Sequence, residues 1–292
     1  MKTETLTYRS VKTRAVLIPL KRPVVSRVGL FKDWPVILID LETNEGIVGR
    51  AYLEPYLARS VRYIIPAIHD LATTHKGKRV APFDNFQANR KALSLIGLQG
   101  VSMIAIAGLD MACWDALAKA SGVPLAQLLG GDRGPVPSYN SNGLWLNPLE
   151  GLEDEAAELA AEGNFTSLKL RLGRNTLAED LTAVKAVRRG VGDDVNLMCD
   201  FNQGQTLSDA LVRCHALDDH GLYWFEEPIP YDEIQSYARL THELRTPVQL
   251  GENFYGPRAL HDALEAKACD YVMPDLMRIG GVTGWLRSSA IA

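Results

Sequence analysis

Three acidic residues recur at one interval in the second half of this chain. Asp200, Glu226 and Glu252 stand 26 residues apart, and they close the apolar runs VNLMCD, YWFE and PVQLGE. One strand-helix-strand step takes roughly 30 residues, so successive parallel strands would carry the three acids to the same end of a sheet. Carboxylate oxygens are hard ligands that suit Mg²⁺ better than zinc or copper. The spacing therefore predicts a magnesium site.

A strand-end acid has a second common role, because Asp and other small polar residues often cap the helix that follows. Capping does not require successive strands to repeat at one period, whereas a metal site on a repeating scaffold does. The equal spacing of Asp200, Glu226 and Glu252 therefore favours the metal interpretation.

The elements that would position these acids change character near residue 130. Before it, strand patterns at 11–20 and 35–43 precede a helical pattern over 101–120, which predicts an α+β domain at 1–130. After it, strand patterns alternate with helical ones. The expected strands are 136–141, 167–172, 196–200, 223–227, 248–252 and 271–275. This order predicts a parallel sheet covered by helices, and so an α/β fold of the (β/α)₈ barrel type at 131–292.

Two basic residues lie on the predicted strand at 167–172. Lys169 and Arg171 are alternate residues, so they project from the same face of the strand. We expect that face to line the barrel interior, where both side chains would reach a substrate.

Composition excludes several other classes of function. The net charge is −4 and the basic residues form no stripe, which disfavours nucleic acid and anionic membranes as partners. No apolar run approaches the ~20 residues needed to cross a bilayer. The four cysteines have no metal-binding spacing, and the start MKTETLTYRS lacks the apolar core of a signal peptide. We expect a reducing, cytoplasmic location.

Several separated strings resemble the enolase superfamily, and within it the mandelate racemase / muconate lactonizing enzyme group. They are TRAVLIPLKRP, DMACWDALAK, LKLRLG, CDFNQ, FEEP, QLGEN and MPDLMRIGGVTGW, in that order along the chain. The resemblance implies an N-terminal α+β domain that caps a barrel, with Mg²⁺ held by Asp200, Glu226 and Glu252. It also implies a small-molecule carboxylate substrate and a homo-oligomer.

The chemistry that the resemblance implies is removal of a proton from the carbon beside a carboxylate. The resulting enediolate carries a second negative charge, which a divalent cation stabilises. Lys169 matches the residue that neutralises the substrate carboxylate. Arg171 stands where mandelate racemase has a basic lysine, and an arginine holds its proton too tightly for that exchange. This difference argues against racemisation by two bases.

Other family positions are matched by Ser141 and Asn202, which are expected to face the substrate, and by Asp275, expected to orient a catalytic histidine on the next strand. That strand would fall near position 300, past Ala292, and all six histidines precede Asp275. We therefore expect a C-terminally incomplete barrel. The segments 23–34 and 52–56 match the loops that close over the site in this family.

Three functions remain open at this point. A mandelate racemase-like isomerase acting on a 2-hydroxy acid agrees with the resemblance and with the apolar residues of segment 23–34. An acid-sugar dehydratase, which eliminates water with one base, agrees better with Arg171. The third is a catalytically inactive, truncated remnant that still binds metal. The residues do not select the substrate, the reaction or the assembly state.

Overall fold

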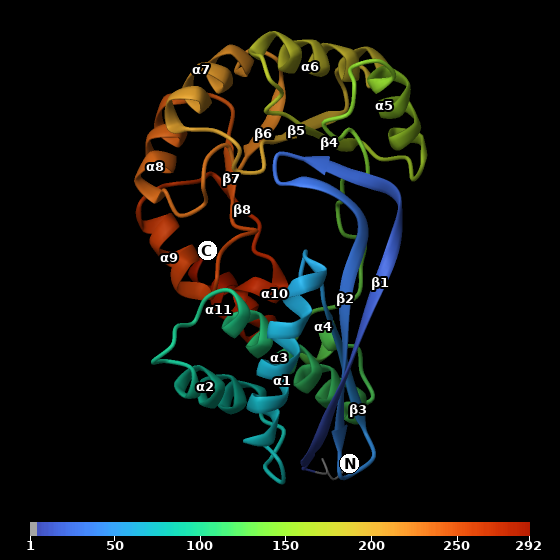
Figure 1. The fold of residues 1–292 in the computed structure, drawn as a ribbon, viewed down its shortest axis with the longest axis vertical. Helices are drawn as coiled ribbons and strands as arrows, with labels where there is room; N and C mark the ends of the chain where they lie inside the picture. Colours follow the sequence, from blue (N-terminus) through green and yellow to red (C-terminus); the bar gives the residue numbers. More distant parts are fainter. Residues whose placement is uncertain (1–4) are drawn as a thin grey trace.

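The computed structural model describes residues 5–292, which form two lobes (Figure 1). The first lobe is an antiparallel sheet of three strands in the order β1-β2-β3, covered on one face by helices. Its elements are β1 (Tyr8–Ser26), β2 (Gly29–Thr43), β3 (Val48–Leu53), the 3-10 helix η1 (Ala58–Ser60), α1 (Val61–Thr73), α2 (Pro82–Ala92), α3 (Val101–Ser121) and α4 (Leu125–Leu128). The predicted α+β character of this region is confirmed.

The alternation of side chains along β2 explains how the first sheet packs. Ile37, Ile39 and Leu41 are fully buried, while Leu38 between them is exposed, as expected for a strand with one covered face. α3 lies so close to this sheet that a Cβ on Gly49 would meet the Ala112 carbonyl oxygen at 2.0 Å. Glycine at this position therefore allows the closest helix-sheet approach.

The long helix α3 corrects one expectation. Over Val101–Ser121 it has a mean hydropathy of 1.5 in its most apolar window, so by length and composition it could cross a membrane. However, 72% of that window is buried inside the protein. Its apolar residues form the core of the first lobe, which explains why the helix is apolar on nearly all sides.

The second lobe is built on a parallel five-stranded sheet in the order β4-β5-β6-β7-β8, with helices along its outer side (Figure 1). Its elements are α5 (Leu152–Ala161), β4 (Ser167–Arg171), α6 (Leu177–Val191), β5 (Asn196–Asp200), α7 (Leu207–Leu217), β6 (Leu222–Glu226), α8 (Ile234–Glu243), β7 (Val248–Leu250), α9 (Pro257–Glu265), β8 (Tyr271–Val272), α10 (Leu276–Ile279) and α11 (Gly281–Ile291). The predicted α/β barrel class, partial in this chain, is confirmed.

Some predicted elements differ from the structure. No strand covers 136–141: Val136 is 81% exposed, and only Asn140 forms a bridge, to Leu168. Without a covering layer, Val136 lacks the packing that a strand there would need. β7 and β8 end early, so Glu252 and Asp275 lie in the loops that follow them.

Asp180, in the first turn of α6, is a buried acid. Its side chain is fully buried and accepts hydrogen bonds from the backbone amides of Gly173 and Arg174. Arg213 of α7 pairs with it at 2.5 Å. The acid therefore fixes the turn that follows β4, a role that helical periodicity does not reveal.

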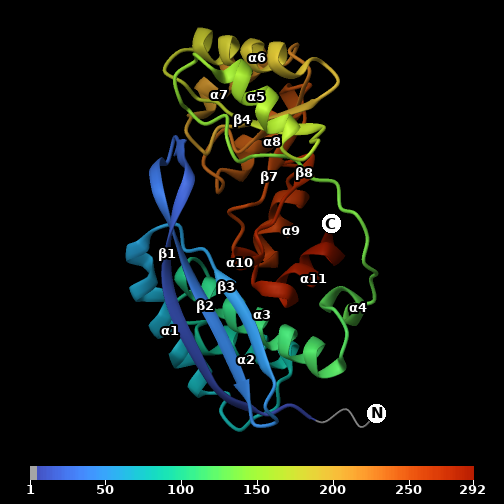
Figure 2. The ribbon, with the colours of Figure 1, turned by 90° about the vertical axis from the view of Figure 1, so that its right-hand side faces the viewer.

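The two lobes meet at several places, including the tip of the β1–β2 hairpin and helix α11. The tip of the β1–β2 hairpin reaches the C-terminal ends of the parallel strands, which form the mouth of the barrel lobe (Figures 1 and 2). There the Leu146 amide donates to the Val25 carbonyl at 2.9 Å. At the second of these places α11 packs on α3. The Asp110 carboxylate accepts from the Thr283 amide at 2.8 Å, and the Trp114 indole donates to the Thr283 hydroxyl at 2.9 Å.

Candidate active site

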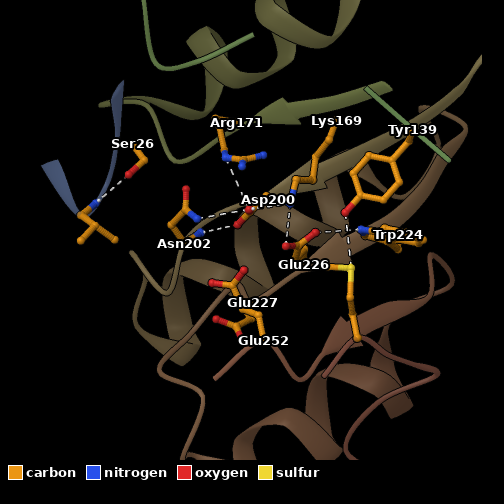
Figure 3. A network of polar contacts seen from close by, with 12 residues as sticks. Ser26, Tyr139, Lys169, Arg171, Asp200, Asn202, Trp224, Glu226, Glu227 and Glu252 are labelled. Atoms are coloured by element: carbon orange, nitrogen blue, oxygen red, sulfur yellow. Dashed lines mark hydrogen bonds and ion pairs between the residues drawn. The ribbon is translucent and has the colours of Figure 1, made fainter. Parts of the chain in front are cut away.

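Parallel register places three of the predicted site residues side by side. Arg171, Asp200 and Glu226 end β4, β5 and β6, and Arg171 pairs in register with Asp200, which pairs with Glu226. Residues in register on neighbouring strands project to the same face. The three side chains therefore share the inner face at the C-terminal end of the sheet (Figure 3).

Lys169 lies two residues before Arg171 and projects toward the same acids (Figure 3). Its ammonium donates to Glu226 Oε1 at 2.8 Å and lies 3.2 Å from Asp200 Oδ2. Trp224 donates its indole N–H to the other oxygen of Glu226 at 3.3 Å. Both acids are almost completely buried, so these charges interact with little solvent screening.

The third predicted ligand, Glu252, follows β7 and joins the cluster through Asn253. The Asn253 amide donates to Glu252 Oε1 at 3.3 Å and to Glu227 Oε2 at 2.5 Å. Asn253 faces the same acids as Glu252 although the two residues are adjacent in sequence, because β7 ends at Leu250 and strand alternation does not apply beyond it.

Burial and mutual repulsion shift the pKa values of the acids at the mouth. Burial, then repulsion from Asp200, raises the pKa of Glu226 to about 8. The pKa values of Glu227 and Glu252 are also raised, by burial first and then by neighbouring carboxylates. Although burial opposes it, Arg171 and Lys169 lower the pKa of Asp200. Crowded buried acids of this kind must either take up protons or gain a cation.

The donor set suits a magnesium ion. The mouth holds the carboxylates of Asp200, Glu226, Glu227 and Glu252, and carboxylate oxygens are the ligands that Mg²⁺ prefers. Glu227 Oε1 is buried without a hydrogen-bond partner. As the side chains lie, no group of three or more His, Cys, Asp or Glu residues within 5–292 is arranged around a metal position. Lys169 is instead the cation between two of the predicted ligands, so the shared ion stays a prediction.

Arg171 has unused hydrogen-bonding capacity. Its guanidinium lies 4.9 Å from the centre of the Trp145 ring, and its Nε is 3.4 Å from Asp200 Oδ2. The Nε and one Nη are nevertheless buried without a hydrogen-bond partner. Buried donors normally have partners, and here an oxygen-rich ligand would supply them.

Asn202, one of the predicted substrate-facing residues, lies beside Asp200. Asn202 donates to both carboxylate oxygens of Asp200, from its backbone amide at 2.7 Å and its side chain at 3.2 Å. Ser141 follows Asn140, which forms a parallel β-bridge with Leu168. Tyr139 lies with its ring 5.6 Å from the Lys169 ammonium. The role of Ser141 stays a prediction, because no strand covers 136–141 and strand alternation does not apply there.

Asp275 lies apart from these residues, at the start of α10. One of its oxygens accepts from the amides of Met277 and Arg278, which makes it the helix N-cap. The other accepts from the Tyr56 hydroxyl at 3.2 Å. Each of the six histidines lies elsewhere: His69 and His75 in the first lobe, and His215, His220, His242 and His261 on or beside the outer helices. None of them contacts Asp275 in the described part of the chain.

The first lobe closes one side of the mouth. Segment 23–34, predicted as a loop, is the tip of the β1–β2 hairpin. There the side chain of Arg27 packs so closely on the loop after β5 that a Cβ on Gly204 would lie 2.7 Å from Arg27 Cγ. Tyr56, in the second predicted segment, stacks edge-on against Trp34 with ring centres 5.6 Å apart.

Three residues with clear roles at the mouth were not singled out from the sequence: Tyr139, Trp224 and Arg278. Trp224 precedes Glu226 by two residues and so shares its inward face, a signal that strand alternation alone contains. Arg278 lies beyond the last strand, and no local pattern indicates its contacts.

Family models match both lobes. The mandelate racemase / muconate lactonizing enzyme N-terminal domain matches residues 8–130, and the enolase C-terminal domain-like model matches 151–292. A D-galactarolactone cycloisomerase from Agrobacterium fabrum is 35% identical over 277 residues, which cover 93% of this chain and 72% of that protein. An L-talarate/galactarate dehydratase from Salmonella typhimurium is 34% identical over 198 residues, and the chain spans only 50% of its length.

Solved structures agree with these matches. An enolase from alpha pretobacterium bal199 with bound magnesium superposes with a TM-score of 0.96 at 52% identity, over 99% of this chain and 80% of that one. An enolase from Bradyrhizobium, complexed with magnesium and mandelic acid, gives 0.94 at 36% identity over the same shares. The chain therefore belongs to the mandelate racemase / muconate lactonizing enzyme family of the enolase superfamily, whose members matched here are racemases, epimerases, cycloisomerases and dehydratases.

Proposed function

We propose that the inner face of β4–β7 forms the magnesium-dependent part of a site that removes the proton next to a carboxylate. The observation that carries this proposal is the register of Asp200 and Glu226 at adjacent strand ends, with Lys169 against both and Glu252 after the next strand. Relatives with named reactions of this type and neighbours crystallised with magnesium support it.

In this proposal Asp200, Glu226 and Glu252 hold the Mg²⁺, which supplies Lewis-acid stabilisation of the charge that develops on the substrate. Lys169 provides a buried ammonium beside these acids, where it neutralises the substrate carboxylate. The unpartnered donors of Arg171 bind a second substrate oxygen. Asn202 fixes the carboxylate of Asp200 through two hydrogen bonds.

Isomerisation of a hydrophobic 2-hydroxy acid is the first candidate reaction. Three aromatic rings of the first lobe pack together, Phe31 edge-on against Trp34 and Trp34 against Tyr56, and Tyr56 contacts Asp275 and Arg278. Such a wall favours an apolar substituent on the substrate. The Bradyrhizobium neighbour that holds mandelic acid, at 36% identity, supports the same substrate class.

Dehydration of a sugar acid is the second candidate, and Arg171 favours it. A guanidinium does not give up its proton near neutral pH, so it cannot serve as one of two bases. Elimination of water needs proton removal on one face only. The talarate/galactarate and arabinonate dehydratases among the relatives accord with this reaction.

Incubation with mandelate and with galactarate in D₂O, with and without Mg²⁺, tests both reactions. Deuterium in recovered mandelate indicates isomerisation, and a 2-keto product from galactarate indicates dehydration. EDTA should abolish either activity. Turnover that is unchanged by EDTA would contradict the proposal, while magnesium binding without exchange or elimination would indicate the inactive remnant.

Assembly and location stay predictions. The neighbours bind small carboxylates such as mandelic acid and L-glucarate, which accords with a small-molecule partner. We propose homo-oligomeric assembly and a reducing, cytoplasmic compartment. The four cysteines are all unpaired, which accords with such a compartment.

A further inference from the structure

Arg278 is a buried arginine at the junction of the two lobes, in the short helix α10. Only 7% of its surface is exposed, so its charge requires partners inside the protein. Those partners come from two directions: the loop after β7 on one side and the first lobe on the other. This arrangement makes Arg278 a link between the acids of the mouth and the segment that closes over them.

On the barrel side, one guanidinium nitrogen donates to the backbone carbonyl of Glu252 at 3.1 Å and also to the side-chain carbonyl of Asn253. With that oxygen engaged, the Asn253 amide nitrogen is turned toward Glu252 and Glu227, to which it donates. Arg278 thus fixes Glu252 twice, directly through its main chain and indirectly through its carboxylate.

On the cap side, the guanidinium carbon lies 4.4 Å from the centre of the Tyr56 ring. The attraction between a guanidinium and a ring face is stronger when the arginine is desolvated, as it is here. Tyr56 has a φ of 58°, a strained conformation for a residue with a side chain, so neighbouring contacts must hold it. Those contacts are Arg278, the hydrogen bond to Asp275, and the edge-on packing against Trp34.

We propose that Arg278 is a positioning residue. It couples the docking of segment 52–56, which contains Tyr56, to the orientation of Glu252. The inference rests on the proposed function, because it takes Glu252 as a magnesium ligand. When Tyr56 covers the guanidinium, the arginine is confined to the geometry that orients Asn253 and Glu252. When Tyr56 leaves, the guanidinium gains water as a competing partner, and its hold on the loop after β7 weakens.

Calorimetric titration with Mg²⁺ alone tests the coupling without any substrate. Arg278→Met removes the donors while keeping much of the apolar stem, and it should weaken magnesium binding about tenfold. Arg278→Lys should restore part of the loss, and Tyr56→Leu should cause a smaller loss. The double variant Arg278→Met with Tyr56→Leu should bind no more weakly than Arg278→Met, because Tyr56 acts through the arginine. Additive losses, or an Arg278→Met affinity within twofold of the wild type, would overturn the proposal.

The matched control is Arg258→Met in α9, whose side chain is 82% exposed and pairs with Asp262. It should leave magnesium affinity unchanged. Circular dichroism and unfolding midpoints identify variants that fail to fold. If Arg278→Met does not fold, the magnesium affinities of Arg278→Lys and Tyr56→Leu are compared with that of the wild type instead.

Amide hydrogen exchange in the metal-free protein gives a second readout. Peptides covering residues 52–60 should exchange faster in Arg278→Met than in the wild type and in Arg258→Met. If the wild type binds no Mg²⁺, the proposed function fails, and these peptides still decide whether Arg278 holds the cap. Unchanged exchange in Arg278→Met would refute its role as a link between the lobes.

Discussion

Two buried polar clusters in this protein differ in how completely their hydrogen bonds are made. In the first lobe, the ring of His75 lies between two amides: Asn85 donates to Nδ1 at 2.8 Å, and Nε2 faces Asn89 Oδ1 at 2.6 Å. The Ala81 amide occupies the Asn85 oxygen. Both ring nitrogens are therefore satisfied by the protein alone.

At the barrel mouth, by contrast, several buried polar atoms lack partners. These are Nε and one Nη of Arg171, Oε1 of Glu227, and the side-chain oxygen and nitrogen of Gln249. A satisfied cluster stabilises the fold, whereas an unsatisfied one costs free energy until a ligand binds. The contrast concerns these two clusters alone, since the hydroxyl of Tyr8, whose ring packs on His75, is also buried without a partner. Substitutions in the two clusters should accordingly change different measured quantities.

The largest expected effect is on metal binding in Glu226→Gln. Loss of a proposed ligand should lower magnesium affinity more than about 100-fold, beyond the range typical for groups that only orient ligands. Calorimetry measures it, with the exposed Glu265→Gln of α9 as the matched control. Equal magnesium affinity in the two variants would remove Glu226 from the site.

Substitution of His75 by Leu should act on stability instead. It leaves the buried amides of Asn85 and Asn89 without their partner, which should lower the free energy of unfolding by about 3 kcal/mol. Denaturant unfolding measures this loss. Magnesium affinity of the folded variant should equal that of the wild type, and a parallel loss of affinity would blur the distinction between the clusters.

The pH dependence of the magnesium effect is a third test. Because the pKa of Glu226 is raised to about 8 in the folded protein, this group binds a proton on folding. Its contribution to stability is complete below pH 4.5 and is lost as the pH rises through 8. Magnesium replaces that proton, so saturating Mg²⁺ should raise the unfolding midpoint more at pH 8.5 than at pH 6. Thermal scans at both pH values measure how far Mg²⁺ raises the unfolding midpoint. A larger rise at pH 6 than at pH 8.5 would contradict the prediction.

The smallest expected effect is at a helix end in the barrel lobe, away from the mouth. Thr176 and Glu179 form a capping box at the start of α6. Thr176→Ala should therefore lower the free energy of unfolding by about 1 kcal/mol. Magnesium affinity should not change, because Thr176 lies away from the mouth. A loss of affinity would contradict the expectation that substitutions outside the mouth change stability alone.

Sequence patterns predicted the elements of this fold better than their contacts. Helix α3 and strands β4 to β6 lie within a residue of their expected bounds, because long apolar periodicity and repeated strand spacing dominate local structure. The strand expected at 136–141 failed, since a short apolar run forms a strand only where a neighbour covers it. The equal spacing located the acids, the family resemblance implied the same three residues, and register explained why Asp200 and Glu226 are adjacent.

Contacts between distant segments were beyond the reach of pattern analysis. Asp180 has the spacing of a solvent-facing residue, yet two loop amides and Arg213 draw it inward. Arg278 contacts Tyr56, more than 200 positions earlier in the chain. Neither partner follows from hydrophobic periodicity, because each depends on how whole elements pack.

Thr283 forms two hydrogen bonds to the first lobe, so the exchange of its amide hydrogen reports separation of the lobes. Its amide is held by Asp110 and its hydroxyl by Trp114, both on α3. Any hinge motion that lifts the first lobe from α11 must break the two bonds in a single event. The exchange rate of that one amide would then record how often the whole molecule opens.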